Sequence, residues 1–417
     1  MSLCLTPAIE RITARITGRE RSMFAEDLER RRAQLGEAIR GSRVLIAGGA
    51  GSIGSATLLE LLDHEPAAVA VLDPSENNLA ELLRTVRSCS RAFEGELALA
   101  PLDYGSPLAR RYLASVAPFD WVLSFAALKH VRSERDDVSL LRMLEVNLLG
   151  ADRFFRAVRE HGHGRAGVFT VSTDKAACPV SLMGASKRAL ELLLWEHRSG
   201  GALQPGQAPF ARATTARFAN VAFSDGSLPW SFLQRLAKEQ PLAAPGDVRR
   251  YLVSPREAGQ LCLVATVLAP DRTVLVPRLD PARDLTDFVR VAEATLGEFG
   301  LTPERYETEA EARTAVGRER SRARYPLLVT RSDTSGEKDE EIFVAHGETA
   351  EECGLAAAQV VPAPAVGSAS LEALLALIED GAVRGAPVTK LDLIRALTEV
   401  VPDLAHLETG KNLDQKM

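Results

Sequence analysis

The fold is decided by the stretch Val44-Leu45-Ile46-Ala47-Gly48-Gly49-Ala50-Gly51-Ser52-Ile53-Gly54. Its first four residues are apolar and predict a short buried strand, and a helix is predicted to follow through Leu62. The glycines repeat in the spacing G-x-x-G-x-x-G, which lets the backbone approach a pyrophosphate at the N-terminus of the helix. The stretch therefore predicts a dinucleotide-binding turn, with cofactor contacts at Gly48, Gly51, Ser52, Ile53 and Gly54.

A carboxylate after the next strand supports this interpretation and indicates which dinucleotide binds. The apolar residues Ala68 to Leu72 predict a second strand, and Asp73 follows it, nineteen residues after Gly54. At this place a carboxylate can accept hydrogen bonds from the ribose hydroxyls of adenosine. Its charge would repel a 2′-phosphate and no arginine follows it closely, so we expect NAD rather than NADP. A structural glycine turn beside a surface aspartate is the alternative.

Strands and helices continue to alternate along the chain. Further strands are predicted at 97–102, 121–125, 168–171, 214–218 and 274–276, and a helix is predicted over 140–158. This alternation is typical of an α/β fold with a doubly wound parallel sheet, the Rossmann fold, whose ligands bind at the carboxyl ends of the strands. Further cofactor contacts are therefore expected at Asp103, Ala126, Ala127, Lys129 and Asn147.

A polar loop at the end of one strand forms the candidate active site. Val168 to Val171 suits a buried strand, Ser172-Thr173-Asp174-Lys175 ends it, and Met183 to Leu194 has the apolar spacing of a helix. Met183 and Lys187 are four residues apart and share one face of that helix. A hydroxyl, a carboxylate and two amines could therefore converge on one pocket. Taken singly, Asp174 could be an N-cap and Lys187 a solvated helix lysine.

Composition narrows the class of protein. The 417 residues are 46% apolar and 25% charged, which is ordinary for a globular protein of two or three domains. A net charge of −6 indicates no nucleic-acid partner. Five widely spaced cysteines argue against a disulfide framework and against a zinc site, so no metal is expected. Because no apolar run is long enough to span a bilayer and the N-terminus carries no signal-like core, we expect a cytoplasmic protein.

Three parts are expected along the chain. Residues 1–40 indicate a charged helical arm for packing or for assembly of a homo-oligomer. Residues 41–280 are expected to form the NAD-binding Rossmann domain, with 221–254 contributing to the substrate site. Residues 281–417 are expected to form a smaller substrate-binding, C-terminal helical domain. Its predicted elements are a helix over 285–299, a strand over 327–330 and two amphipathic helices near 371–378 and 390–400.

Motifs along most of the chain are similar to those of one family. They are GGAGSIGS at 48, LDPSENNL at 72, AALKHV at 126, VNLLG at 146, STDKAACPVSLMGASKR at 172, RFANV at 217, RRYLVSPREA at 249 and SGEK at 335. The sequence resembles the extended short-chain dehydrogenase/reductases, and within them the CapD-like polysaccharide-biosynthesis branch that contains UDP-N-acetylglucosamine 4,6-dehydratases. The resemblance implies a tightly held NAD(P) cofactor, recycled within each turnover, and a nucleotide-sugar substrate.

The resemblance also implies roles for single residues. Thr173 matches the catalytic Ser/Thr, Lys187 matches the lysine that binds the nicotinamide ribose, and Asp174 and Lys175 match the acid and base of the elimination. Met183 stands where most relatives have the catalytic tyrosine, as it does in some dehydratases of this branch. Because a thioether cannot usefully accept a proton, another group, or a water held by Thr173 or Lys187, must act as the base for oxidation at C4.

Departures from the family pattern concern the substrate side. The branch usually has arginine where this chain has Asp225 and Thr334, both on the side of the sugar nucleotide. Arg250 matches a retained phosphate-binding arginine, and Arg331 is close enough in sequence to replace the second one. Substrate contacts are accordingly expected at Lys129, Asn220, Ser227, Arg250, Arg331 and Glu337.

The expected function is that of an NAD-dependent nucleotide-sugar 4,6-dehydratase, which converts UDP-N-acetylglucosamine or a near relative to a 4-keto-6-deoxy sugar. Lys175 would remove the C5 proton, and Asp174 would protonate the departing C6 hydroxyl. A nucleotide-sugar epimerase shares the oxidation step but needs no acid/base pair at C5 and C6. The alternative from another class is a catalytically inactive NAD-binding regulatory protein. Met183 and the two missing arginines keep this alternative open, whereas the presence of Asp174, Lys175 and Lys187 argues against it.

Overall fold

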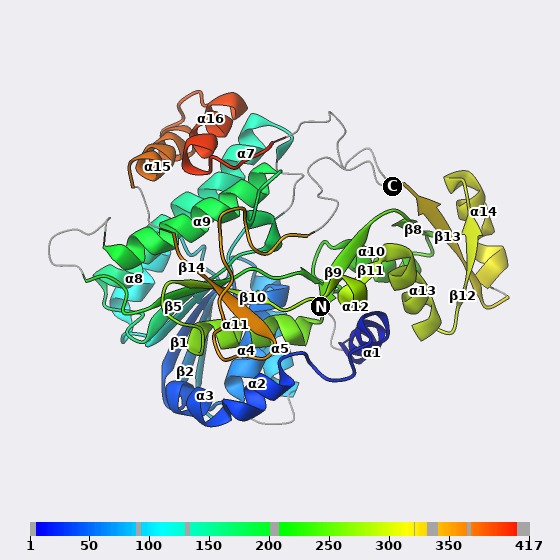
Figure 1. The fold of residues 1–417 in the computed structure, drawn as a ribbon, viewed down its shortest axis with the longest axis horizontal. Helices are drawn as coiled ribbons and strands as arrows, with labels where there is room; N and C mark the ends of the chain where they lie inside the picture. The colour runs from blue at the N-terminus through cyan, green and yellow to red at the C-terminus, as the bar shows by residue number, and fades with distance from the viewer. Residues whose placement is uncertain are drawn as a thin grey trace.

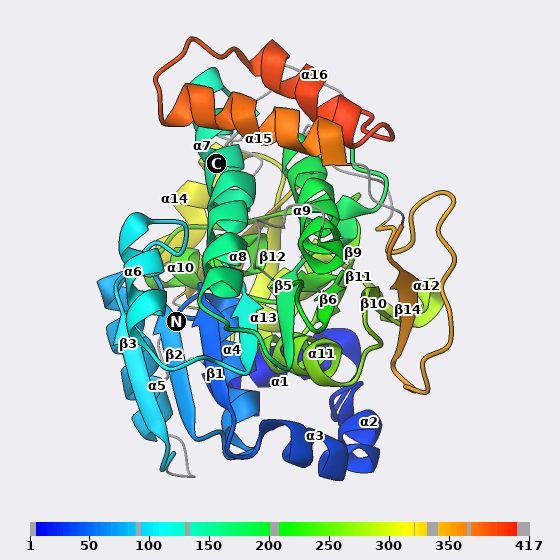
Figure 2. The same ribbon diagram turned by 90° about the vertical axis from the view of Figure 1, so that its left-hand side faces the viewer.

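The computed structural model describes residues 6–88, 93–129, 134–200, 208–320, 322–331, 341–364 and 368–406. Within these residues, eight strands form one sheet in the order β3-β2-β1-β4-β5-β6-β10-β14 (Figures 1 and 2). Their bounds are β1 Arg43–Ala47, β2 Ala68–Leu72, β3 Glu96–Ala100, β4 Trp121–Ser124, β5 Gly167–Val171, β6 Ala213–Ala216, β10 Thr273–Pro277 and β14 Ala358–Pro362. Neighbouring strands are parallel, except that β14 runs antiparallel to β10. The predicted α/β fold with a parallel sheet is confirmed.

The strand order creates a crevice at the centre of this sheet. The chain adds β2 and β3 on one side of β1, and then β4, β5 and β6 on the other side. Ligands of such sheets bind outside the carboxyl ends of the strands at this switch point. The last residues of the two central strands, Ala47 and Ser124, are partners in register, and Phe125 N donates to Ala47 O at 2.7 Å. The turns that follow β1 and β4 therefore lie side by side.

Helices cover both faces of the sheet. In β1, Leu45 and Ala47 belong to one core, whereas Val44 and Ile46 belong to the other. The first core includes residues of α6 (Pro107–Ser115), α7 (Asp137–Leu144), α8 (Gly150–Glu160), α9 (Leu182–Ser199), α15 (Ser368–Ala382) and α16 (Lys390–Val400). The second includes residues of α3 (Arg32–Ile39), α4 (Ser52–Leu62), α5 (Glu76–Ser88) and α11 (Pro255–Val267). Burial on both sides explains why the strands are almost continuously apolar. None of the helices in the described ranges is long and apolar enough to cross a membrane.

A smaller lobe lies to the right of the large sheet in Figure 1. Its parallel strands are β8 (Leu242–Pro245), β12 (Thr302–Tyr306) and β13 (Arg324–Thr330). The helices of this lobe are α1 (Thr6–Thr17), α10 (Leu228–Ala237), α13 (Phe288–Glu298) and α14 (Glu309–Arg320). A short sheet of β7 (Asn220–Val221), β9 (Arg249–Val253) and β11 (Leu285–Asp287) lies between the two lobes. Figure 1 shows α12 (Pro281–Asp284) beside this sheet. Ligands bound at the crevice would therefore meet residues from both lobes.

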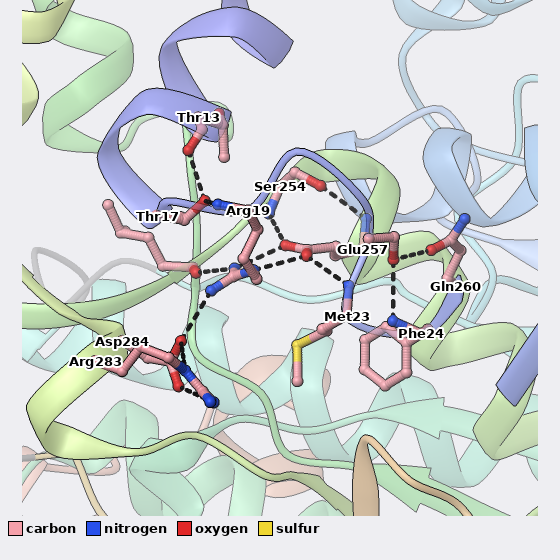
Figure 3. Close-up of polar contacts among 12 residues, drawn as sticks. Thr13, Thr17, Arg19, Met23, Phe24, Ser254, Glu257, Gln260, Arg283 and Asp284 are labelled. Atoms are coloured by element: carbon pink, nitrogen blue, oxygen red, sulfur yellow. Dashed lines mark hydrogen bonds and ion pairs between the residues drawn. The ribbon is translucent and has the colours of Figure 1, made fainter. Parts of the chain in front are cut away.

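The N-terminal helices connect the two lobes. α1 packs on α13, whereas α2 (Ala25–Arg30) and α3 lie beneath the large sheet. Between them, Arg19 donates from Nε and Nη2 to the two carboxylate oxygens of Glu257, and both distances are 2.9 Å (Figure 3). The same guanidinium donates to Leu252 O at 2.8 Å and to Asp284 at 3.3 Å. The arm expected over 1–40 therefore packs along its own chain, and its part in an oligomer stays a prediction.

The packing differs from the sequence-based expectations at three places. The helix expected over 140–158 is divided, because a π-helical turn, η3 (Glu145–Leu149), separates α7 from α8. The helix expected from Leu285 begins at Phe288, because Leu285–Asp287 pairs as β11 and Asp287 caps the helix. The expected boundary near residue 280 does not follow the packing, since β14 pairs with β10 and α15 and α16 join the first core.

Candidate active site

The glycine-rich turn lies at the carboxyl end of β1 and leaves no room for a Cβ at Gly48 or at Gly54. Gly48 has a φ of +70°, and a Cβ there would lie 2.5 Å from the backbone nitrogen of Ala126, in the turn after β4. A Cβ on Gly54 would lie 2.6 Å from Gly48 O. Gly51 is the N-cap of α4, and a Cβ there would have Gly48 O as its nearest atom at 3.6 Å. The residues present therefore fit a pyrophosphate held against the N–H groups of the first turn, where Ser52 and Ile53 follow.

Asp73 lies at the end of β2 and is tied to this turn. Its Oδ2 accepts a hydrogen bond from Ala50 N at 3.2 Å, and its Oδ1 accepts one from Ser75 N at 3.0 Å. Burial raises the pKa of this carboxyl, against the effect of the two backbone donors. Asp103, after β3, instead accepts from Gly105 N at 3.0 Å and lies 3.8 Å from the guanidinium of Arg142. Of the two predicted carboxylates, Asp73 is the one joined to the glycine-rich turn.

Asp225 also lies against the glycine-rich turn. Ser52 Oγ donates to Asp225 Oδ2 at 2.8 Å, and Asp225 N donates to Ser52 Oγ at 3.0 Å. Both residues line a small pocket whose other members are Ala50, Ser55, Phe223, Ser224 and Pro255. Phe223 has a left-handed backbone conformation, with φ +56°, just before this contact. From the sequence, Asp225 was expected beside the sugar nucleotide; its observed partner belongs to the turn expected to hold the cofactor phosphates.

A buried amide fixes the turn after β4, which contains Ala126 and Ala127. Asn147, in η3, accepts a hydrogen bond from Leu128 N at 2.8 Å. Its Nδ2 donates to Leu128 O and to Ser186 Oγ, both at 3.0 Å. Asn147 therefore joins the 126–129 turn to α9. Lys129 ends this turn, and desolvation lowers its pKa against the opposing charge of Asp225.

The predicted acid and base meet at the carboxyl end of β5, on the short 3-10 helix η4 (Asp174–Ala176) that Thr173 caps. Thr173 Oγ1 donates to Asp174 Oδ1 at 2.7 Å, and Lys175 Nζ lies 3.2 Å from the same oxygen. The Asp174 residue is 2% exposed. Burial lowers the pKa of Lys175, but the charges of Asp174 and Glu341 outweigh burial and leave this pKa above its usual value. Asp174 and Lys175 thus form an ion pair whose amine holds its proton firmly.

Met183 and Lys187 share the buried face of α9, as their spacing predicts. Met183 is 5% exposed, and its backbone nitrogen donates to Glu134 Oε1 at 2.9 Å. Lys187 is 4% exposed and donates from Nζ to Val171 O at 3.3 Å. Burial lowers the pKa of Lys187 to about 8, against the charge of Glu191. The alternative of a solvated lysine is wrong, and the buried carboxylate of Glu134 was not identified from the sequence.

A second carboxylate missed by sequence reasoning, Glu341, lies on the substrate side of the site. Its Oε2 accepts a hydrogen bond from Tyr251 N at 2.6 Å, and its Oε1 accepts one from Asn220 Nδ2. Burial and the charge of Asp174 raise the pKa of Glu341 to about 8, while Lys175 and Arg250 oppose this. Arg250 is itself buried, and its Nη1 donates to Arg249 O at 2.9 Å. The signal in the sequence was the SGEK motif, which closely precedes Glu341.

The remaining substrate-side predictions have different outcomes. Ser227 Oγ accepts a hydrogen bond from Trp230 N at 3.3 Å and caps α10, which accounts for its conformation. Arg331 has an exposed side chain and ends a described range. Thr334 and Glu337 lie outside the described residues.

A buried ion-pair network fixes the base of the site. Arg217, just after β6, donates to the two oxygens of Glu191 on α9, at 2.8 and 2.7 Å. Its Nη1 also donates to Glu348 Oε2 at 2.6 Å and to Phe343 O at 2.9 Å. Ser172 Oγ donates to Glu191 as well. Because each buried charge has charged partners, the network joins β5, α9 and the 341–348 segment in one arrangement.

Comparison with known proteins gives a consistent result. The model of a family described as polysaccharide biosynthesis protein matches residues 44–346. The chain is 27% identical over 307 residues to an uncharacterized membrane protein of Methanocaldococcus jannaschii, covering 73% of this chain and 85% of that protein. It is 26% identical over 261 residues to the UDP-N-acetylglucosamine 4,6-dehydratase (inverting) of Campylobacter jejuni, covering 61% of this chain and 71% of that protein. The X-ray structure of Pen from Bacillus thuringiensis shares the fold, with a TM-score of 0.59 at 21% identity over 79% of this chain and 89% of that chain.

Proposed function

Since the chain belongs to the polysaccharide biosynthesis protein family, we propose that it is an NAD-dependent nucleotide-sugar 4,6-dehydratase. The proposed substrate is UDP-N-acetylglucosamine or a near relative, and the product is the 4-keto-6-deoxy sugar. The 4,6-dehydratase relative supports this choice at low identity. The observation that carries the proposal is the contact of Asp174 with both Thr173 and Lys175, in the same site as the buried amine of Lys187.

Bound NAD would supply the oxidation at C4 and the later reduction at C6. The glycine-rich turn would hold its pyrophosphate, and Asp73 would accept hydrogen bonds from the adenosine ribose. Lys187 would bind the nicotinamide ribose, because its buried amine lies at the carboxyl end of β5, where Nζ donates to Val171 O at 3.3 Å. Its lowered pKa favours a lysine that gives up and regains a proton near neutral pH.

The Asp174-Lys175 pair performs the elimination in this proposal. At rest the amine is protonated and the carboxylate is charged. Transfer of one proton from Lys175 Nζ to Asp174 Oδ1, across 3.2 Å, gives a neutral amine and a carboxylic acid. The amine then takes the C5 proton, and the acid protonates the C6 hydroxyl as it leaves as water. Charges and protons balance over these steps, and the pair returns to its resting form.

Arg250 would hold the pyrophosphate of the sugar nucleotide. The residue is 8% exposed, so a phosphate contact there would be poorly screened by solvent. Asn220, one strand away in the short sheet of β7, β9 and β11, would contact the sugar. Arg250 comes from the region 221–254 that was expected to contribute to the substrate site, and Asn220 directly precedes that region.

The test is to incubate the protein with NAD and a panel of nucleotide sugars and to measure the loss of one water by mass spectrometry. The variant Lys175→Met should block dehydration while reduced cofactor accumulates, visible by its absorbance. The exposed Lys238→Met is the matched control and should behave as the unaltered protein. Normal dehydration by Lys175→Met would refute the assignment of the base.

Two other outcomes would replace the proposal. Interconversion of C4 epimers without loss of water would identify an epimerase. Binding of NAD without turnover of any nucleotide sugar would instead support a regulatory protein.

A further inference from the structure

Glu341 is held by two donors that come from the substrate side of the site. Tyr251 N belongs to β9, next to Arg250, and Asn220 Nδ2 belongs to β7. Because one N–H of Nδ2 donates to Glu341, the amide is oriented with Oδ1 turned away from that carboxyl, where it can accept a hydrogen bond from a bound sugar. Glu341 therefore fixes which polar atom Asn220 offers to a ligand.

The segment that carries Glu341 is anchored independently of these two bonds. The buried Arg217 donates to Phe343 O at 2.9 Å, and to Glu348 as well. The ring of Phe343 also packs on that of Tyr251, with centroids 5.7 Å apart. The backbone that follows Glu341 is thus held in place by Arg217 and by the ring of Tyr251, and this anchoring keeps the carboxyl in the site.

Three charged groups surround this carboxyl. Asp174 and Lys175 act on it from η4, and Arg250 acts on it from β9. Burial and Asp174 favour the protonated form, whereas Lys175, Arg250 and the Tyr251 N–H favour the charged form. Because the interaction is mutual, a negative charge on Glu341 raises the pKa of Lys175, which is the direction found for that amine.

We propose that Glu341 is a positioning residue of this site, which orients the amide of Asn220 for the sugar and controls, by its charge, when Lys175 can act as a base. The inference rests on the proposed function. It adds a third ionisable group to the Asp174-Lys175 pair, taken from a segment that lies far away in the sequence.

The first experiment separates the two parts of this role with two variants. Glu341→Gln removes the charge and replaces one of the two acceptor oxygens by a donor, so that Tyr251 N and Asn220 Nδ2 can no longer both be accepted. Dehydration of UDP-N-acetylglucosamine by this variant should show a KM raised roughly three- to tenfold, as for one lost hydrogen bond. In the unaltered protein the rate should fall as pH rises through the pKa of Glu341, about 8, because the charged carboxylate then holds the proton on Lys175. This fall should be absent in Glu341→Gln.

Glu341→Asp keeps the charge but shortens the side chain. It should raise KM in the same way while the pH profile stays close to that of the unaltered protein. The matched control is Glu351→Gln, an exposed carboxylate of the same described segment, which should change neither quantity. An unchanged pH profile in Glu341→Gln would overturn the proposed control of Lys175, and an unchanged KM would overturn the proposed positioning of Asn220.

A second experiment does not depend on the reaction. When the pKa of a carboxyl is raised in the folded state, the free energy of unfolding falls as pH rises towards that pKa. The urea midpoint of the unaltered protein should therefore fall, relative to that of Glu341→Gln, between pH 5 and pH 8. The difference in urea midpoint between the unaltered protein and Glu351→Gln should stay constant over this range. If the protein dehydrates no nucleotide sugar, the proposed function fails, while this measurement still decides whether Glu341 is the buried proton-bearing group; a constant difference for Glu341→Gln would show that it is not.

Discussion

Ser52 Oγ donates a hydrogen bond to Asp225 Oδ2 at 2.8 Å, which holds a carboxylate against the first turn of α4. The N-terminus of this helix is the place proposed for the cofactor pyrophosphate, which carries negative charge. A second negative charge there opposes the binding of NAD, unless Asp225 turns away when the cofactor enters. We therefore expect this contact to couple the segment after β7 to occupation of the proposed cofactor site.

Asp225→Asn should bind NAD more tightly than the unaltered protein. Removal of one like charge near the pyrophosphate is worth on the order of 1 kcal/mol, or about fivefold in Kd, at low salt. Calorimetric titration with NAD measures this, and the gain should shrink as salt is added. Asp380→Asn, which removes an exposed carboxylate on α15, is the control. Weaker binding of NAD by Asp225→Asn would mean that the carboxylate supports the cofactor instead of repelling it.

Asp73 should determine the choice between NAD and NADP. Asp73→Ala removes the acceptor proposed for the adenosine ribose and the charge that would repel a 2′-phosphate. The loss for NAD should be roughly three- to tenfold in Kd, while NADP should lose less or gain, so the gap between them narrows. Kd values for both dinucleotides check this, with Asp63→Ala, in the loop after α4, as the control. Equal affinity of the unaltered protein for both cofactors would contradict the assignment.

Lys187 should lower the stability of the folded protein. Its pKa falls from the usual value of 10.5 to about 8 on burial. Between these two values the unfolded chain binds more protons, so the free energy of unfolding rises with pH and the cost of Lys187 is greatest below pH 8. Lys187→Met should therefore raise the free energy of unfolding at pH 7 by about 2 kcal/mol, once the lost bond to Val171 O is allowed for.

Urea unfolding at pH 7 and at pH 10 measures this effect, and the gain should be smaller at pH 10. The exposed Lys238→Met is the control, and its free energy of unfolding should be close to that of the unaltered protein at each pH. A variant that is less stable than the unaltered protein at both pH values would show that Lys187 supports the fold. The same variant should be inactive if Lys187 binds the nicotinamide ribose.

The parts of the site that could be predicted are those built from neighbouring residues. The glycine-rich turn and Asp73 follow two adjacent strands, so their spacing in the sequence determines their places in the sheet. Thr173, Asp174 and Lys175 are likewise consecutive, and α9 begins soon after them. Periodicity was enough to place Met183 and Lys187 on one face, because α9 is regular over both residues.

Contacts between distant segments could not be predicted. Glu134 lies between β4 and α7, and Glu341 lies between β13 and β14, so neither belongs to a motif directly after a strand. The position of Glu341 depends on Arg217, which recruits Phe343 and Glu348 through charges that carry no pattern in the sequence. The π-helical turn around Asn147 was also missed, because a helix with the same apolar spacing would satisfy the sequence equally well.

The Arg19-Glu257 contact should be the main link between the N-terminal helices and the rest of the fold (Figure 3). The side chains of Glu257 and Asp284 are 4% and 2% exposed, so Arg19→Met would leave two buried carboxylates without this partner. The free energy of unfolding should fall by about 2–4 kcal/mol, the usual cost of breaking a buried pair. Urea unfolding measures the loss, and hydrogen exchange should show faster opening at α1 and at the start of α11.

Arg21→Met is the matched control, since Arg21 and its partner Glu29 are 74% and 72% exposed and an exposed pair contributes little. Equal stability of the two variants would mean that the hydrophobic contacts of Ile9, Ile12 and Ile16, and not Arg19, hold the arm in place.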